Sequence, residues 1–66
     1  MNFVYLFLCG SEWEDIIVFL SEEDAIKESI RWPNHRVEIF CKTDKSGYKP
    51  TYNHYKNGLL IENNKM

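Results

Sequence analysis

The chain has few of the residues that tie small proteins together. Its 66 residues include two cysteines, three glycines and two prolines. One disulfide is the most they can form, which excludes the disulfide-rich miniproteins of oxidising compartments. Because glycine and proline are scarce while 44% of residues are apolar and 27% are charged, collagen-like, low-complexity and fully disordered classes are excluded as well.

The sequence also lacks a long apolar run. None approaches the roughly 18 residues that a membrane-spanning helix requires, so no membrane partner is expected. The apolar stretch Phe3–Cys9 is preceded by Met1 and Asn2, whereas a signal peptide begins with basic residues. We therefore expect an intracellular protein of the cytoplasm, the nucleus or a virion, and not a secreted one.

Cations are nearly missing from the first half of the chain. Residues 1–30 carry one cation, Lys27, against seven acids, whereas residues 31–66 carry seven Lys or Arg against three acids. The overall charge of -2 therefore hides an acidic half and a basic half. Such asymmetry steers association or marks a basic face, but it also arises when an acidic helix simply lies beside lysine-rich loops.

The pattern predicts one helix among several strands. Ser21 begins the helix as an N-cap with Asp24 three residues on, and Trp32-Pro33 ends it because proline disfavours helical geometry in the residue before it. The expected core stripe is Ala25, Ile26, Ser29 and Ile30. Strands are predicted at 2–9 (buried on both faces), 15–20, 36–42, 51–56 and 59–62.

These elements define the expected fold. Asn57-Gly58 predicts a tight hairpin, because both turn positions favour a positive φ angle. The first two strands form another hairpin, Asp44–Gly47 a turn, and Pro50 a strand start or a sheet edge. The fold class is α+β, with one antiparallel sheet of about five strands and a single helix on one face. Residues 1–62 form one small domain and 63–66 a frayed tail.

Part of this pattern resembles a known group of proteins. The matching segments are Val4–Leu6, Gly10, Glu12–Asp15, Val18–Ala25, Trp32-Pro33 and Val37–Phe40. Over residues 3–42 the chain resembles small uncharacterised β-β-α-β proteins of bacteriophages and large or giant DNA viruses. That group has no assigned activity, so the resemblance implies a viral accessory protein and assigns no catalytic residue.

Metal and cofactor sites are not predicted. Cys9, Cys41, His35 and His54 could supply zinc ligands, but none has the close partner that structural zinc sites show. Both cysteines fit the alternation of a strand, so we expect two free, buried thiols.

Catalysis is not predicted either. Glu12, Glu14 and Asp15 crowd one turn, where solvation is the expected state because nothing predicts a pocket. No nucleophile motif and no phosphate-binding loop occurs. The protein is therefore expected not to be an enzyme and to need no cofactor.

Two kinds of partner remain. Lysines and tyrosines alternate between residues 42 and 56, which is typical of single-strand nucleic-acid binding, although the pI of about 5.6 argues against it. The residues of this alternative are Lys42, Lys45, Lys49, Lys56 and Tyr48.

Protein–protein contact is the preferred hypothesis. A core this small supplies only about 3–5 kcal/mol, which favours a homodimer or a host or viral partner. In the last hairpin Tyr52, His54, Leu59 and Ile61 share one face, and Thr51, Asn53, Tyr55, Leu60 and Glu62 the other. The first face is the predicted interface, unless it packs under the helix. Trp13 is expected to fold onto the core, with partner contact as the alternative.

Overall fold

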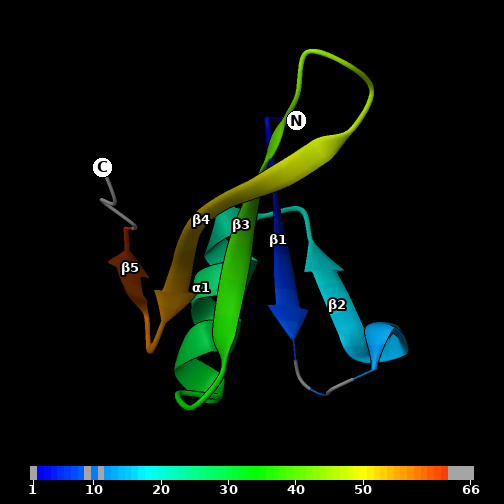
Figure 1. Ribbon diagram of the computed structural model, residues 1–66. Coiled ribbons are helices and arrows are strands. Elements are labelled where there is room, and N and C mark those ends of the chain that lie inside the picture. Colours follow the sequence, from blue (N-terminus) through cyan, green and yellow to red (C-terminus); the bar gives the residue numbers. More distant parts are fainter. Residues whose placement is uncertain (1, 9, 11, 63–66) are drawn as a thin grey trace.

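The computed structural model describes residues 2–8, 10 and 12–62, which form one antiparallel sheet and one helix (Figure 1). The strand order across the sheet is β2-β1-β3-β4-β5, and every neighbouring pair is antiparallel. This confirms the predicted α+β class. The elements are β1 (Phe3–Leu8), a 3-10 turn η1 (Trp13–Asp15), β2 (Ile16–Phe19), α1 (Glu22–Arg31), β3 (Arg36–Lys42), β4 (Tyr48–Lys56) and β5 (Leu59–Ile61).

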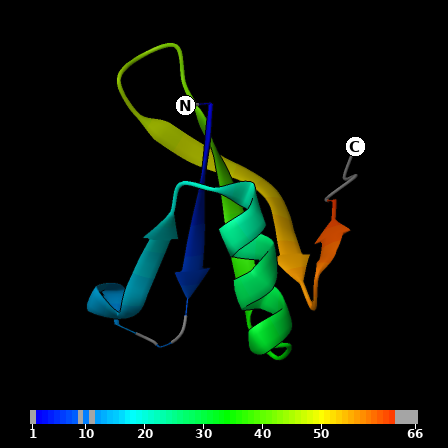
Figure 2. The same cartoon turned by 180° about the vertical axis from the view of Figure 1, so that it is seen from behind.

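The helix covers one face of the sheet (Figure 2). Alternate residues of β1, β3 and β4 point toward it, because successive side chains of a strand point to opposite faces. The described residues bury only six apolar side chains, which form a single cluster between α1 and the sheet. These are Tyr5, Phe7, Ala25, Val37, Ile39 and Tyr55.

The helix begins and ends where the sequence predicts. The Ser21 hydroxyl accepts a hydrogen bond from the backbone N–H of Asp24 at 3.4 Å. At the other end the Trp32 N–H donates to the Glu28 carbonyl at 3.0 Å, and Pro33 follows. Ala25 and Ser29 are buried, whereas Ile30 lies at the margin of the predicted stripe and is exposed.

The hairpin turn between β4 and β5 is fastened to the helix. Asn57 and Gly58 have φ angles of 53° and 80°, as the Asn-Gly pair predicts. The Gly58 N–H donates to the Ser29 hydroxyl at 2.9 Å, and that hydroxyl donates to the Ile26 carbonyl at 2.7 Å. Ser29 is therefore a fully buried polar residue whose hydrogen-bonding capacity is used.

Two details of the predicted strands are wrong. β1 is not buried on both faces: Tyr5 and Phe7 are buried, but Val4 and Leu6 are half-buried and Leu8 is exposed, because one helix covers only one face. β4 begins at Tyr48 rather than Thr51, so Pro50 lies inside it. Pro50 pairs with Phe40 of β3, and β5 pairs only with His54–Lys56, which leaves Pro50 on a sheet edge as expected.

Of the two predicted free thiols, the structure describes that of Cys41. Cys41 is a free cysteine on the helix-facing side of β3 and is half-buried. Cys9 and the predicted tail at residues 63–66 lie outside the described residues.

Replacing Gly58 with alanine is expected to destabilise the protein. A left-handed φ costs a residue with a Cβ about 1–2 kcal/mol. The added Cβ would also lie 2.9 Å from Cγ1 of Ile30. Urea denaturation of Gly58→Ala should show that loss in the free energy of unfolding. Gly47→Ala is the matched control, because its Cβ would meet no atom within 4 Å and its φ is not left-handed. Equal stability of the two variants would contradict this account of the turn.

Candidate functional site

The sheet face opposite the helix is not covered by any other element of the described chain and is the first candidate site (Figure 1). We call it the open face. Its side chains follow from the register of the five strands and the alternation within each strand. They are Val4, Leu6, Leu8, Ile16, Val18, Arg36, Glu38, Phe40, Lys42, Tyr48, Pro50, Tyr52, His54, Lys56, Leu59 and Ile61.

One half of the open face is apolar. β1 and β2 place five aliphatic side chains there with no charged residue among them, and Val18 at the sheet edge is 53% exposed. We call this group the apolar patch; its members are Val4, Leu6, Leu8, Ile16 and Val18. Contiguous exposed apolar surface of this kind marks contact sites on small proteins.

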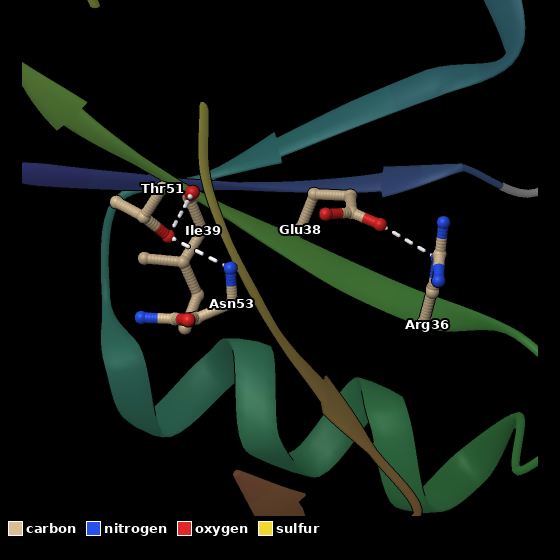
Figure 3. A network of polar contacts seen from close by, with 5 residues as sticks. All are labelled: Arg36, Glu38, Ile39, Thr51 and Asn53. Carbon is tan, nitrogen blue, oxygen red and sulfur yellow. Dashed lines mark hydrogen bonds and ion pairs between the residues drawn. The ribbon is translucent and has the colours of Figure 1, made fainter. Parts of the chain in front are cut away.

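The other half of the open face contains a hollow of about 380 Å³ above β3, β4 and β5. On its β3 wall, Arg36 Nε donates to Glu38 Oε2 at 2.6 Å (Figure 3). The Glu38 side chain is 17% exposed and that of Arg36 59% exposed, so the carboxylate is the more enclosed partner. The lining residues are Arg36, Glu38, Tyr52, His54, Ile61 and Glu62.

A bulge in β4 shapes the hollow. Between the pairs Glu38–His54 and Phe40–Pro50, three residues of β4 stand opposite Ile39 alone. The Thr51 hydroxyl donates to the Ile39 carbonyl at 2.8 Å and accepts from the Asn53 N–H at 3.1 Å, replacing ladder bonds that the bulge breaks (Figure 3). Tyr52, at the centre, adopts a φ of 68° and is 66% exposed at the rim of the hollow.

The sequence did not predict the bulge. The run Thr51–Lys56 reads as a regular strand, and positive φ angles are uncommon for aromatic residues. Thr51, which can bond to the backbone two residues on, is the only local signal. The predicted interface residues Tyr52, His54, Leu59 and Ile61 nevertheless share the open face. Glu62, predicted on the opposite face, lines the open-face hollow because it follows the end of β5.

Trp13 does not fold onto the core, and that expectation is wrong. The residue begins η1, a single 3-10 turn closed by the Asp15 N–H donating to the Glu12 carbonyl at 3.0 Å. The Trp13 side chain is 79% exposed. Glu12, Glu14 and Asp15 are exposed around it, so the structure places this turn in solvent at the β2 end of the sheet.

The possible metal ligands lie on different parts of the molecule. His35 packs edge-on against Phe7 and Trp32, with ring centroids 5.9 and 6.5 Å apart. His54 lies on the open face and Cys41 on the helix-facing side of β3. Within residues 2–8, 10 and 12–62, no three His, Cys, Asp or Glu side chains are grouped as metal ligands.

The lysines of the nucleic-acid hypothesis are only partly brought together. Lys42, Lys45 and Lys49 surround a hollow of about 430 Å³ at the loop between β3 and β4. Tyr48 is next to them, paired with Lys42 across the strands. Lys56 lies at the far end of β4, paired with Arg36, and does not belong to this group.

A further hollow, on the helix side, contains a tyrosine–carboxylate pair. The Tyr55 hydroxyl donates to Glu22 Oε2 in the first turn of α1, and the Tyr5 ring lies 6.3 Å from the Tyr55 ring. Burial raises the pKa of Tyr55 well above its usual 10.0, and the hydrogen bond and charge of Glu22 raise it further. Burial, followed by the charge of Glu22, also raises the pKa of Tyr5. The pair joins β4 to the start of the helix.

Comparison with protein families, with curated proteins and with solved structures finds no match to this chain. In the described part of the chain no helix is long and apolar enough to span a membrane, since α1 has ten residues.

Alkaline pH should unfold the protein as the Tyr55–Glu22 pair breaks. A pKa raised above its unfolded value near 10.0 stabilises the fold below pH 10, and this stabilisation is lost as the pH rises further. Tyr55→Phe should lower the free energy of unfolding at neutral pH by about 1–2 kcal/mol. It should also remove the Tyr55 phenol, the later of the two late-ionising ones, from an ultraviolet titration. Glu22→Gln is the control: it keeps the side-chain shape and should move that late ionisation toward lower pH. A wild-type titration without late-ionising tyrosines would contradict the pair.

Proposed function

We propose that the protein is a small non-catalytic interaction protein that acts through protein–protein contacts at its open face, as a homo-oligomer. The observation that carries the proposal is the uncovered face itself. Two layers are the usual minimum for a domain, and here the second layer is one helix of ten residues on one side of five strands. A further layer from another chain would complete the open face as a second core.

The small core supports the same proposal. In the described chain six apolar side chains are buried, whereas thirteen large apolar ones are exposed. Scattered exposed apolar residues are normal, but two of these, Leu8 and Val18, lie in the apolar patch beside the half-buried Val4, Leu6 and Ile16. A partner that buried the patch would remove aliphatic surface from water, and each Å² buried would stabilise the complex by about 25 cal/mol. The resemblance to small viral β-β-α-β proteins supports an accessory role and a viral or host protein as an additional partner.

The mass of the protein in solution tests the homo-oligomer. Light scattering coupled to size exclusion should give a multiple of the 7.9 kDa chain mass. The double variant Leu59→Lys/Ile61→Glu should remain folded by circular dichroism and run as a monomer, because both residues are exposed on the open face. Leu20→Glu, an exposed position outside the strands, is the control and should keep the native mass. A monomeric wild type, or an unchanged oligomer in the double variant, would overturn the proposal.

A second candidate function is contact with nucleic acid, favoured by the gathering of Lys42, Lys45 and Lys49 beside Tyr48. Phosphate contacts release counterions, so such binding must weaken steeply with salt. Fluorescence anisotropy with labelled single and double strands should detect it at low salt, and Lys42→Ala/Lys49→Ala should abolish it. Lys56→Ala is the control, because Lys56 lies at the other end of β4. No binding at low salt would remove this function.

A further inference from the structure

We infer that the open face is covered by a second copy of this chain, related by a two-fold axis that runs approximately parallel to β3. The inference rests on the proposed function and specifies its geometry. Two sheets can pack face to face with aligned strands, at an angle of about 30° between their strand directions. A two-fold axis in the interface plane can run along the strands or across them, and the two cases bring different halves of the face together.

The strand order decides which halves meet. β3 is the central strand of β2-β1-β3-β4-β5, with the apolar patch on one side and the hollow on the other. An axis along β3 places β2 and β1 of one copy over β5 and β4 of its partner. The apolar patch then packs into the hollow, twice, by symmetry. An axis across the strands would place hollow over hollow, and the space of about 380 Å³ in each would stay unfilled.

Charge selects the same axis. The acids Glu12, Glu14 and Asp15 lie in η1 or directly before it, at the Ile16 end of β2. Lys56 and Arg36 pair at the same end of the sheet, on its other side. An axis along β3 preserves the strand direction and brings the acids of each copy toward Lys56 of its partner, whereas an axis across the strands takes them to the opposite end of the partner's sheet. Complementary charge fixes the orientation of an interface more than its affinity.

The residue rows across the sheet fit this arrangement. Through the register of the four strand pairs, one open-face row crosses all five strands. An axis along β3 maps the row onto itself in reverse, so Val18 meets the partner's Ile61 and Leu6 meets the partner's His54. At the centre Glu38 meets its symmetry copy, and each is already neutralised by its own Arg36. The row reads Val18, Leu6, Glu38, His54 and Ile61.

Cysteine cross-linking tests the axis. In a Cys9→Ser/Cys41→Ser background, Val18→Cys/Ile61→Cys should give a covalent dimer with a short bismaleimide. Val18→Cys and Ile61→Cys alone should give none, since four strand spacings of about 4.8 Å separate like positions by roughly 19 Å. Val18→Cys/Leu60→Cys is the matched control, because Leu60 is the neighbour of Ile61 on the helix-facing side.

Each outcome separates the inference from the proposed function. A covalent dimer from Val18→Cys alone would indicate an axis across the strands or pairing between β2 edges, and would overturn the inference while leaving the oligomer standing. A dimer by light scattering that never cross-links between positions 18 and 61 would do the same. A protein that is monomeric by light scattering would overturn the proposed function and the inference together.

Charge variants in the native chain provide the second arm, should the serine background fail to fold. With the axis along β3, Val18→Lys/Ile61→Glu places opposite charges in contact twice, whereas Val18→Lys/Ile61→Lys places like charges there. The first should dimerise about ten-fold more tightly or better by sedimentation equilibrium. Equal dimerisation of the two would overturn the inference, because an axis across the strands opposes like charges in both.

Discussion

One short helix facing five strands is the constraint on which the rest of the structure depends. Ten residues of α1 bury Ala25 and Ser29 against the sheet, and they reach only the helix-facing side chains of the strands. Every open-face residue must therefore be tolerated in water or covered by another molecule. The helix is held at both ends by polar bonds to β4 and its turn, from Glu22 to Tyr55 and from Ser29 to Gly58. These bonds hold the helix against one face of the sheet, so the opposite face stays open.

The bulge in β4 lengthens the strand without changing its alternation. Because three residues stand opposite Ile39, two extra residues enter the strand, so Asn53 and Tyr55 stay on the helix-facing side and Tyr52 stays on the open face. Without these extra residues the hollow above Glu38 and His54 would lack its aromatic rim. The bulge requires an unfavourable positive φ angle at Tyr52. The Thr51 hydroxyl offsets this by hydrogen bonds to the Ile39 carbonyl in β3 and the Asn53 N–H in β4. Bulges often re-aim side chains in this way next to functional sites.

The predictable parts of this fold are those encoded by short-range chemistry. Ser21, Pro33 and Asn57-Gly58 fix a helix start, a helix end and a turn, because each acts on the backbone within a few residues of itself. Alternation in β3 separates Val37 and Ile39 from Glu38 correctly. Trp13 and the bulge were not predictable, since the direction of an indole on a 3-10 turn and a register shift depend on tertiary packing. The Tyr55–Glu22 bond joins residues 33 positions apart, and no local pattern signals it.

The strand order determines where the acidic and basic residues of the sequence lie on the sheet. Along the chain, acidic and basic residues merely fall in different halves. The crossover through α1 places β3 beside β1 and leaves β2 as the outer strand, so that the halves become opposite sides of one sheet. In the proposed dimer, the apolar patch, with acids at the η1 end of its side of the sheet, faces the hollow and Lys56 of the partner only after rotation about the central strand. If such a dimer forms, folding and association are coupled, since a core of six apolar side chains gains a second core from its partner. Stability would then depend on protein concentration, and a substitution on the open face would act on the fold through the partner that it displaces.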